Sequence, residues 1–81
     1  MNTIETIPLS MLPVGKKCEV VCVSSSGNER RRMLDLGLVN GTTVEAVLRS
    51  PSGDPVAYYI RGALIALRDS DAQKITVKYL S

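Results

Sequence analysis

The sequence predicts a mainly β fold: a small five-stranded barrel with one short α-helix between its first and second strands. Short runs rich in β-branched and apolar residues recur along the chain, and several alternate between apolar and polar side chains. Turns that contain glycine or proline separate these runs. One segment has the apolar spacing of a helix instead. Closing so short a sheet into a barrel removes its exposed edges, so we expect a closed sheet.

The five predicted strands, in chain order, are residues 17–23, 42–49, 56–60, 63–67 and 75–79. Because neighbouring side chains of a strand point to opposite faces, the second strand should carry Val44, Ala46 and Leu48 on one face. The same alternation separates Tyr58 from Tyr59 in the third strand. One of these tyrosines should therefore belong to the core and the other should be exposed.

The predicted helix covers residues 29–36. Ser26 and Glu29 have the spacing of a capping box at its N-terminus, with Asn28 as an alternative N-cap. Gly37 can adopt the positive φ that often ends a helix. The remaining predicted features are single helical turns at residues 9–12 and 69–73, a broad turn at 50–55, and a two-residue hairpin turn at Arg61-Gly62.

Length and charge limit the classes of function. The chain has 81 residues and a formal net charge of +2, which predicts one domain over residues 1–81. That charge is too small for a general nucleic-acid binder, which must neutralise several phosphates. The sequence has no apolar run near the about 20 residues that span a membrane. Residues 1–5 lack the basic and apolar regions of a signal peptide, so we expect a cytoplasmic protein.

The residue types needed for catalysis are scarce. The sequence contains no histidine, the commonest general base and transition-metal ligand. It also lacks the G-x-x-x-x-G-K-[ST] loop that binds nucleotide phosphates. Asp69 and Asp71 could form a carboxylate pair, but capping and solvation of a surface turn explain them better. We therefore predict no catalytic residue, no enzyme activity and no tightly bound cofactor. Weak contact of acidic side chains with divalent transition-metal ions is compatible with this composition.

Three residues separate Cys18 from Cys22. On a regular strand both thiols would point to the same face, with their Cα atoms about 13 Å apart. A disulfide needs Cα atoms within about 7 Å, so we expect two reduced thiols that act as small apolar side chains. Metal or redox chemistry at the pair is the alternative interpretation, and no residue is predicted as a metal ligand.

Binding to a partner is the function that the remaining charged and aromatic residues favour. Three consecutive arginines lie near the N-terminus of the predicted helix, where cations oppose the helix dipole. An acidic partner or a bound phosphate would explain them; a solvated helix face is the alternative. The proline-containing turn and the exposed tyrosine after it offer a second contact area. The predicted partner-binding residues are Arg30, Arg31, Arg32, Arg49, Pro51, Asp54 and Tyr59.

Five motifs in fixed order cover nearly the whole chain. They are Leu9-Ser10-x-Leu12-Pro13-x-Gly15, Arg32-Met33-Leu34-Asp35-Leu36-Gly37-Leu38-x-x-Gly41-Thr42-x-Val44, Pro51-x-Gly53-Asp54-Pro55, Arg61-Gly62-x-x-Ile65-Ala66-Leu67-Arg68 and Ala72-x-x-Ile75-x-Val77. Together they resemble the FeoA family of small cytoplasmic proteins of bacterial ferrous-iron uptake. The resemblance implies an SH3-like barrel. It also implies an accessory protein that binds and modulates FeoB, the membrane transporter with a cytoplasmic GTP-binding domain. The contact would be with that cytoplasmic region or with the membrane part of FeoB, and the accessory protein would not itself be embedded in the membrane.

Two other functions stay open at this point. The same barrel occurs as the C-terminal domain of iron-dependent repressors, so the chain could be a metal-responsive domain, although no helix-turn-helix region precedes it. Lys16, Lys17 and Arg49, with the three arginines, would suit a small nucleic-acid-binding barrel. The low net charge and the few aromatic residues stand against that function, and we expect no nucleic-acid partner.

Overall fold

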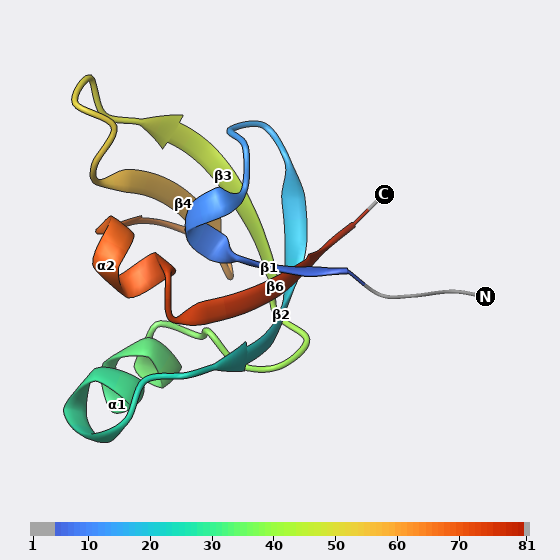
Figure 1. Ribbon diagram of the computed structural model, residues 1–81, viewed down its shortest axis with the longest axis vertical. Coiled ribbons are helices and arrows are strands. Elements are labelled where there is room, and N and C mark those ends of the chain that lie inside the picture. Colours follow the sequence, from blue (N-terminus) through green and yellow to red (C-terminus); the bar gives the residue numbers. More distant parts are fainter. Residues whose placement is uncertain (1–4, 81) are drawn as a thin grey trace.

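The structure is a computed structural model that describes residues 5–80. The signal-peptide prediction concerns mainly residues 1–4, which lie outside the described residues. In chain order the elements are β1 (Thr6–Pro8), the 3-10 helix η1 (Leu9–Met11), β2 (Lys17–Val23), α1 (Gly27–Asp35), β3 (Thr43–Arg49), β4 (Val56–Ile60), β5 (Ala63–Leu67), α2 (Asp69–Ala72) and β6 (Ile75–Tyr79). Figure 1 shows their arrangement.

The strands form one antiparallel sheet with the order β1-β6-β2-β3-β4-β5 (Figure 1). The mainly β fold and the helix between the predicted first and second strands, now β2 and β3, are confirmed. The count of five strands is wrong by one, because β1 also pairs with β6, where Thr6 lies opposite Lys78. Three residues that end in proline carry no alternation that sequence reasoning could detect.

The sheet is also not closed. Among the described strands, β1 and β5 each pair with one neighbour only, so the expected closure is wrong. β1 is three residues long and ends at Pro8, which has no backbone N–H to donate to another strand. One edge of the sheet is therefore short and blunt, and the other edge is the whole length of β5.

Two register shifts change which side chains reach the core. One lies between Val20 and Cys22 in the β2–β6 ladder, and the other lies between Ala46 and Leu48 in the β3–β4 ladder. An extra residue in one strand reverses the facing of the residues after it. Leu48 is consequently 63% exposed, so its predicted place on the face of Val44 and Ala46 is wrong.

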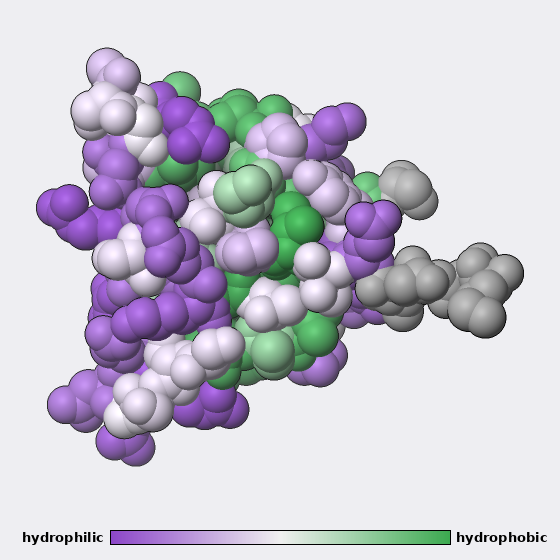
Figure 2. Space-filling model, in the orientation of Figure 1, coloured by the Kyte–Doolittle hydropathy of each residue, from purple (hydrophilic) through white to green (hydrophobic). Residues whose placement is uncertain are grey.

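The core lies between the sheet, η1 and α2, which contact each other, with one side chain contributed by α1. Tyr58 is buried and Tyr59 is half-exposed, as the alternation predicts. The face shown in Figure 2 has hydrophilic side chains gathered over the two α-helices and apolar side chains toward its centre. The largest fully buried side chains are Tyr58, Leu9, Leu12, Met33, Leu38, Ile60, Leu67, Ile75, Val20, Val44, Val77 and Cys18.

The N-terminus and the C-terminus of helix α1 are stabilised by different interactions. Ser26 is the N-cap residue, but its side chain makes no capping bond, so the predicted capping box does not form. The Glu29 carboxylate instead accepts a 2.7 Å bond from the Lys74 ammonium group. At the C-terminus, Gly37 has a φ of 93°, and its N–H and that of Leu38 donate back to carbonyls of the last turn. This is the glycine-terminated helix end that the sequence predicts.

The hairpin between β4 and β5 turns at Arg61 and Gly62, as predicted. Both residues have positive φ, 50° and 84°, as a two-residue type I′ turn requires. The aliphatic part of the Arg61 side chain lies directly on Gly37, at the end of α1. The hairpin tip and the end of α1 are thereby fixed against each other.

Candidate partner-binding surface

The outer face of β3, β4 and β5 carries an exposed apolar patch. Tyr59 on β4 lies between Glu45 on β3 and Leu64 on β5, and the next cross-strand row is Leu48, Ala57 and Ala66. Solvent exposure is 49% for Tyr59, 60% for Leu64 and 63% for Leu48. Contiguous exposed apolar side chains of this kind often mark protein-binding surfaces. We call the patch formed by Leu48, Ala57, Tyr59, Leu64 and Ala66 the outer face.

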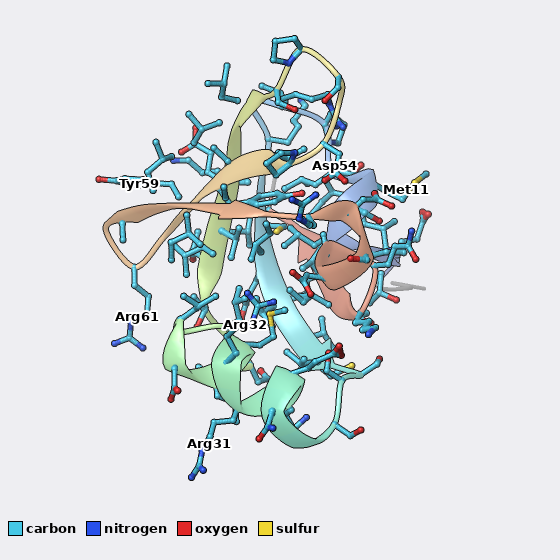
Figure 3. All side chains as sticks on the ribbon, turned by 90° about the vertical axis from the view of Figure 1, so that its left-hand side faces the viewer. Met11, Arg31, Arg32, Asp54, Tyr59 and Arg61 are labelled. Atoms are coloured by element: carbon cyan, nitrogen blue, oxygen red, sulfur yellow. The ribbon has the colours of Figure 1, made fainter. Side chains whose placement is uncertain are left out.

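A shallow groove lies between the end of α1 and the β4–β5 hairpin. Its volume is about 380 Å³, and most of its lining is apolar. Asp35 and Arg61 are the charged residues that line it. Figure 3 shows the Arg61 side chain at the hairpin tip, directed toward the end of the molecule where α1 lies. The residues of this α1–β5 groove are Leu34, Asp35, Leu36, Gly37, Ile60, Arg61, Ala63 and Ile65.

The three consecutive arginines have three different surroundings. The Arg30 guanidinium donates to the Val23 carbonyl oxygen at 2.9 Å, and the Arg32 guanidinium pairs with the Asp71 carboxylate at 2.8 Å. Arg31 is exposed and makes no hydrogen bond or ion pair with any residue from 5 to 80; Figure 3 shows it pointing away from the domain. A helix turns by about 100° per residue, which separates neighbouring side chains in this way.

The loop between β3 and β4 is held by its own polar groups. The Arg49 guanidinium donates to the Gly53 carbonyl oxygen at 3.2 Å. The Asp54 carboxylate accepts a 2.8 Å bond from the backbone N–H of Asp69, the first residue of α2. Pro51 is exposed in the same loop. Arg49 and Asp54 thus already have intramolecular partners.

The predicted partner-binding residues do not gather on one surface. Figure 3 shows Tyr59 projecting from one side of the sheet, while Asp54 lies toward the other side. Of the seven residues, Arg31, Pro51 and Tyr59 are exposed and have no polar partner in the described part of the chain. Sequence reasoning missed Leu64 and Arg61. The turn Arg61-Gly62 fixes the register of β5 against β4, in which Leu64 lies opposite the exposed Tyr59. This turn was the sequence signal from which the exposure of Leu64 could have been predicted.

The two thiols do not face each other. Cys18 is fully buried, and Cys22, which follows the register shift in β2, is exposed, so the predicted shared face is wrong. Burial raises the pKa of the Cys18 thiol to about 11, which keeps it protonated at neutral pH. Across residues 5–80 there is no cluster of three or more side chains suited to holding a metal ion.

No helix within residues 5–80 has the length and apolar character needed to cross a membrane. The longest helix, α1, has nine residues and carries several charges.

Comparison with known proteins identifies the family of this chain. A family model described as the FeoA domain matches residues 7–79. The Fe(2+) transport protein A/Fe(2+) transporter FeoB fusion protein of Porphyromonas gingivalis is 40% identical over 73 residues. That match covers 90% of this chain but 9% of the fusion protein, so the chain spans a small part of that relative's length.

Solved structures agree with the fold. The solution NMR structure of the FeoA protein from Chlorobium tepidum is 37% identical, with a TM-score of 0.86, and the match covers 93% of this chain and 71% of that one. The zinc-complexed crystal structure of Stenotrophomonas maltophilia FeoA, a prokaryotic SH3 domain protein, is 32% identical with a TM-score of 0.77. That match covers 85% of this chain and 86% of the other. The family-model match over residues 7–79 and these relatives show that this chain belongs to the FeoA family and has its SH3-like fold.

Proposed function

We propose that this protein is an accessory factor of bacterial ferrous-iron uptake that binds a FeoB-type transporter from the cytoplasm and modulates it. The fusion relative carries the proposal, because it joins a similar domain to a FeoB transporter in one polypeptide. A covalent link raises the local concentration of one domain around the other, which is useful when the two domains bind each other. A domain of this kind that is not joined to the transporter would have to reach the same contact by affinity alone.

The surface described above is suited to binding a partner. The exposed apolar side chains of the outer face and the α1–β5 groove offer contact area, and Arg31 and Arg61 offer unpaired positive charge within the described residues. A bound accessory protein modulates a transporter when it binds one conformation of the transporter more tightly than another. No chemical step on the part of this chain is needed.

Direct binding tests the proposal first. The unaltered chain should co-purify with the detergent-solubilised FeoB-type transporter of the same organism. Replacing Arg31 by glutamate should weaken this binding, because the exposed guanidinium is free to contact acidic groups. Lys16→Glu is the matched control, because it makes the same charge change at a different place. Lys16 comes just before β2, whereas Arg31 lies in α1, which comes after the other end of β2. Equal binding of both variants would remove Arg31 from the contact.

Iron uptake tests the modulation. Cells that lack this chain should take up Fe(II) more slowly, and the unaltered chain should restore the rate. A variant that folds but does not bind the transporter should fail to restore it. Normal Fe(II) uptake in the deletion strain would contradict the proposed function.

A further inference from the structure

The β5 edge of the sheet has free backbone groups at two defined residues. In the two-residue hairpin, Ile60 and Ala63 flank the turn and exchange hydrogen bonds, and this pattern repeats at every second residue. Ala63, Ile65 and Leu67 therefore bond to β4. The N–H and C=O groups of Leu64 and Ala66 point the other way, to the side where the described chain supplies no strand.

This edge has none of the usual devices that prevent strand pairing. β5 contains five apolar residues in succession, with no charge and no proline, and its register with β4 is continuous. Natural proteins normally protect an edge with lysine, proline, a bulge or a very short strand. The other edge, β1, has two of these protections, because it is three residues long and ends at Pro8. β5 is thus open to pairing with another strand.

The α1–β5 groove lies beside this edge. Leu34 and Leu36 at the end of α1 form one wall, and Ala63 and Ile65 of β5 form the other. Side chains of an added strand would alternate between the two faces of the sheet. Those on one face would enter the groove beside Ile65, and those on the other would lie next to Leu64, at the margin of the outer face.

The charges at the two ends of β5 indicate which kind of segment could bind along this edge. Arg61 precedes the strand and Arg68 follows it, and neither guanidinium is paired with a group in residues 5–80. Of the two acids in α2, Asp71 pairs with Arg32, and the Asp69 carboxylate accepts a hydrogen bond from the Gln73 side-chain amide. Unpaired positive charge at both ends favours a segment whose apolar centre is flanked by acidic residues.

We propose that β5 binds an extended segment of its protein partner as an additional antiparallel or parallel strand, with apolar side chains in the α1–β5 groove and acidic residues at Arg61 and Arg68. This strand addition gives affinity through main-chain hydrogen bonds and selectivity through the groove. The inference rests on the proposed function, in which the partner is a FeoB-type transporter, and it places the bound segment in that transporter's cytoplasmic part.

Two variants and one matched control test the edge in titrations against that cytoplasmic part. Ala66→Pro removes an outward N–H without removing a bond to β4, and Leu64→Lys places a charge on the edge. Both should weaken binding about tenfold or more: the proline removes an interface hydrogen bond, and the lysine places a charge against the apolar centre of the added strand. Met11→Lys is the control: Met11, at 67% exposed, is about as exposed as Leu64 but lies on η1, outside the outer face and the α1–β5 groove, and binding of this variant should stay within about twofold.

Amide exchange gives a readout that does not depend on substitutions. In the free chain the N–H groups of Leu64 and Ala66 should exchange rapidly with solvent, and in the complex they should be protected. The amide spectrum of each variant verifies its fold. Protection of these two amides at high concentration without the transporter would show that a second copy occupies the edge, which would overturn the proposed occupant.

The remaining outcomes separate the two proposals. Binding to the whole solubilised transporter without binding to its cytoplasmic part would overturn the strand addition alone. If the unaltered chain binds neither, the proposed function fails, and the strand addition fails with it. If it binds, but Ala66→Pro binds equally well and the two amides stay exposed, only the strand addition is overturned. Equal losses for Leu48→Lys and Leu64→Lys would move the contact from the edge to the whole outer face.

Discussion

Two buried side chains with labile protons, Cys18 and Tyr58, make the folded state sensitive to high pH. Burial raises the pKa of Cys18 to about 11 and that of Tyr58 to about 12. Both groups lie in the same core, and the Tyr58 hydroxyl donates to the Leu9 carbonyl oxygen at 3.5 Å. Each group must be uncharged to stay buried, because the interior solvates an anion poorly.

The free energy of unfolding should therefore decrease as the solution becomes alkaline. For each group the folded pKa lies above the unfolded value of 9.0 or 10.0, so the unfolded state loses its proton first. The stabilisation is complete below about pH 9 and should fall by a few kcal/mol by about pH 12. Urea unfolding followed by circular dichroism at a series of pH values measures this.

Single substitutions divide that pH dependence between the two groups. Cys18→Val should remove the part that begins near pH 9, and Tyr58→Phe should remove the part that begins near pH 10. The Cys22→Ser control should leave the profile unchanged, because Cys22 is exposed. A free energy of unfolding that does not change between pH 8 and pH 12 would contradict the prediction.

At the scale of elements, the end of α1 depends on Gly37. A Cβ atom there would meet the side chain of Arg61, and the φ of 93° is unfavourable for any residue with a side chain. Gly37→Ala should lower the free energy of unfolding by about 2 kcal/mol or more, from backbone strain and from the displaced hairpin. Thermal or urea unfolding measures the loss.

A second glycine separates the two causes. Gly53 has nearly the same φ, 91°, but nothing lies within 4 Å of its would-be Cβ. Gly53→Ala should therefore show the cost of the backbone conformation alone, about 1–2 kcal/mol. The double variant Gly37→Ala, Arg61→Ala should recover the difference. Equal losses for Gly37→Ala and Gly53→Ala would mean that the contact with Arg61 does not matter.

Two features with a local backbone signal were predicted correctly, whereas three features that depend on distant contacts were not. Gly37 and the turn Arg61-Gly62 act through their own backbone, so their roles are readable from a few neighbouring residues. The register shifts before Cys22 and Leu48 exist only because of the partner strands β6 and β4. β1 is a strand only because β6 lies beside it.

At the scale of the whole molecule, α1 is attached to the rest of the fold at few points. Met33 is its one fully buried side chain, and the ion pairs Arg32–Asp71 and Glu29–Lys74 are exposed. Met33→Ala should cost about 2–5 kcal/mol, because it leaves a cavity in the core. Arg32→Ala should cost no more than about 1 kcal/mol, as for other exposed pairs.

The matched control for these variants is Arg31→Ala. The next residue, Arg32, carries the same charge but makes an ion pair with Asp71. Comparing Arg31→Ala with Arg32→Ala therefore isolates the link between α1 and α2. Arg31→Ala should change the free energy of unfolding by less than about 0.5 kcal/mol, measured by urea unfolding. A loss at Arg31 as large as that at Met33 would show that this side chain is structural and not free for a partner.

The candidate site was less predictable than the fold. The three arginines are equivalent in the sequence, and only the positions of Val23 and Asp71 in space distinguish Arg31 from the other two. Every residue of β5 is apolar, so alternation could not show which of them face solvent. The charges of Arg49 and Asp54 suggested a partner, but the folded loop and α2 already satisfy them.

The pairing of β1 with β6 sets Thr6 opposite Lys78, so the first and last strands run side by side (Figure 1). A polypeptide joined before β1 and one joined after β6 would leave the domain from the same corner. A linker of a few residues could likewise connect the two strands and allow new termini in the Pro51–Gly53 loop, a circular permutation that keeps every strand pair. The order of the elements along the chain is therefore separable from the shape they build, and an attached domain can be moved from one end to the other without relocating its point of attachment.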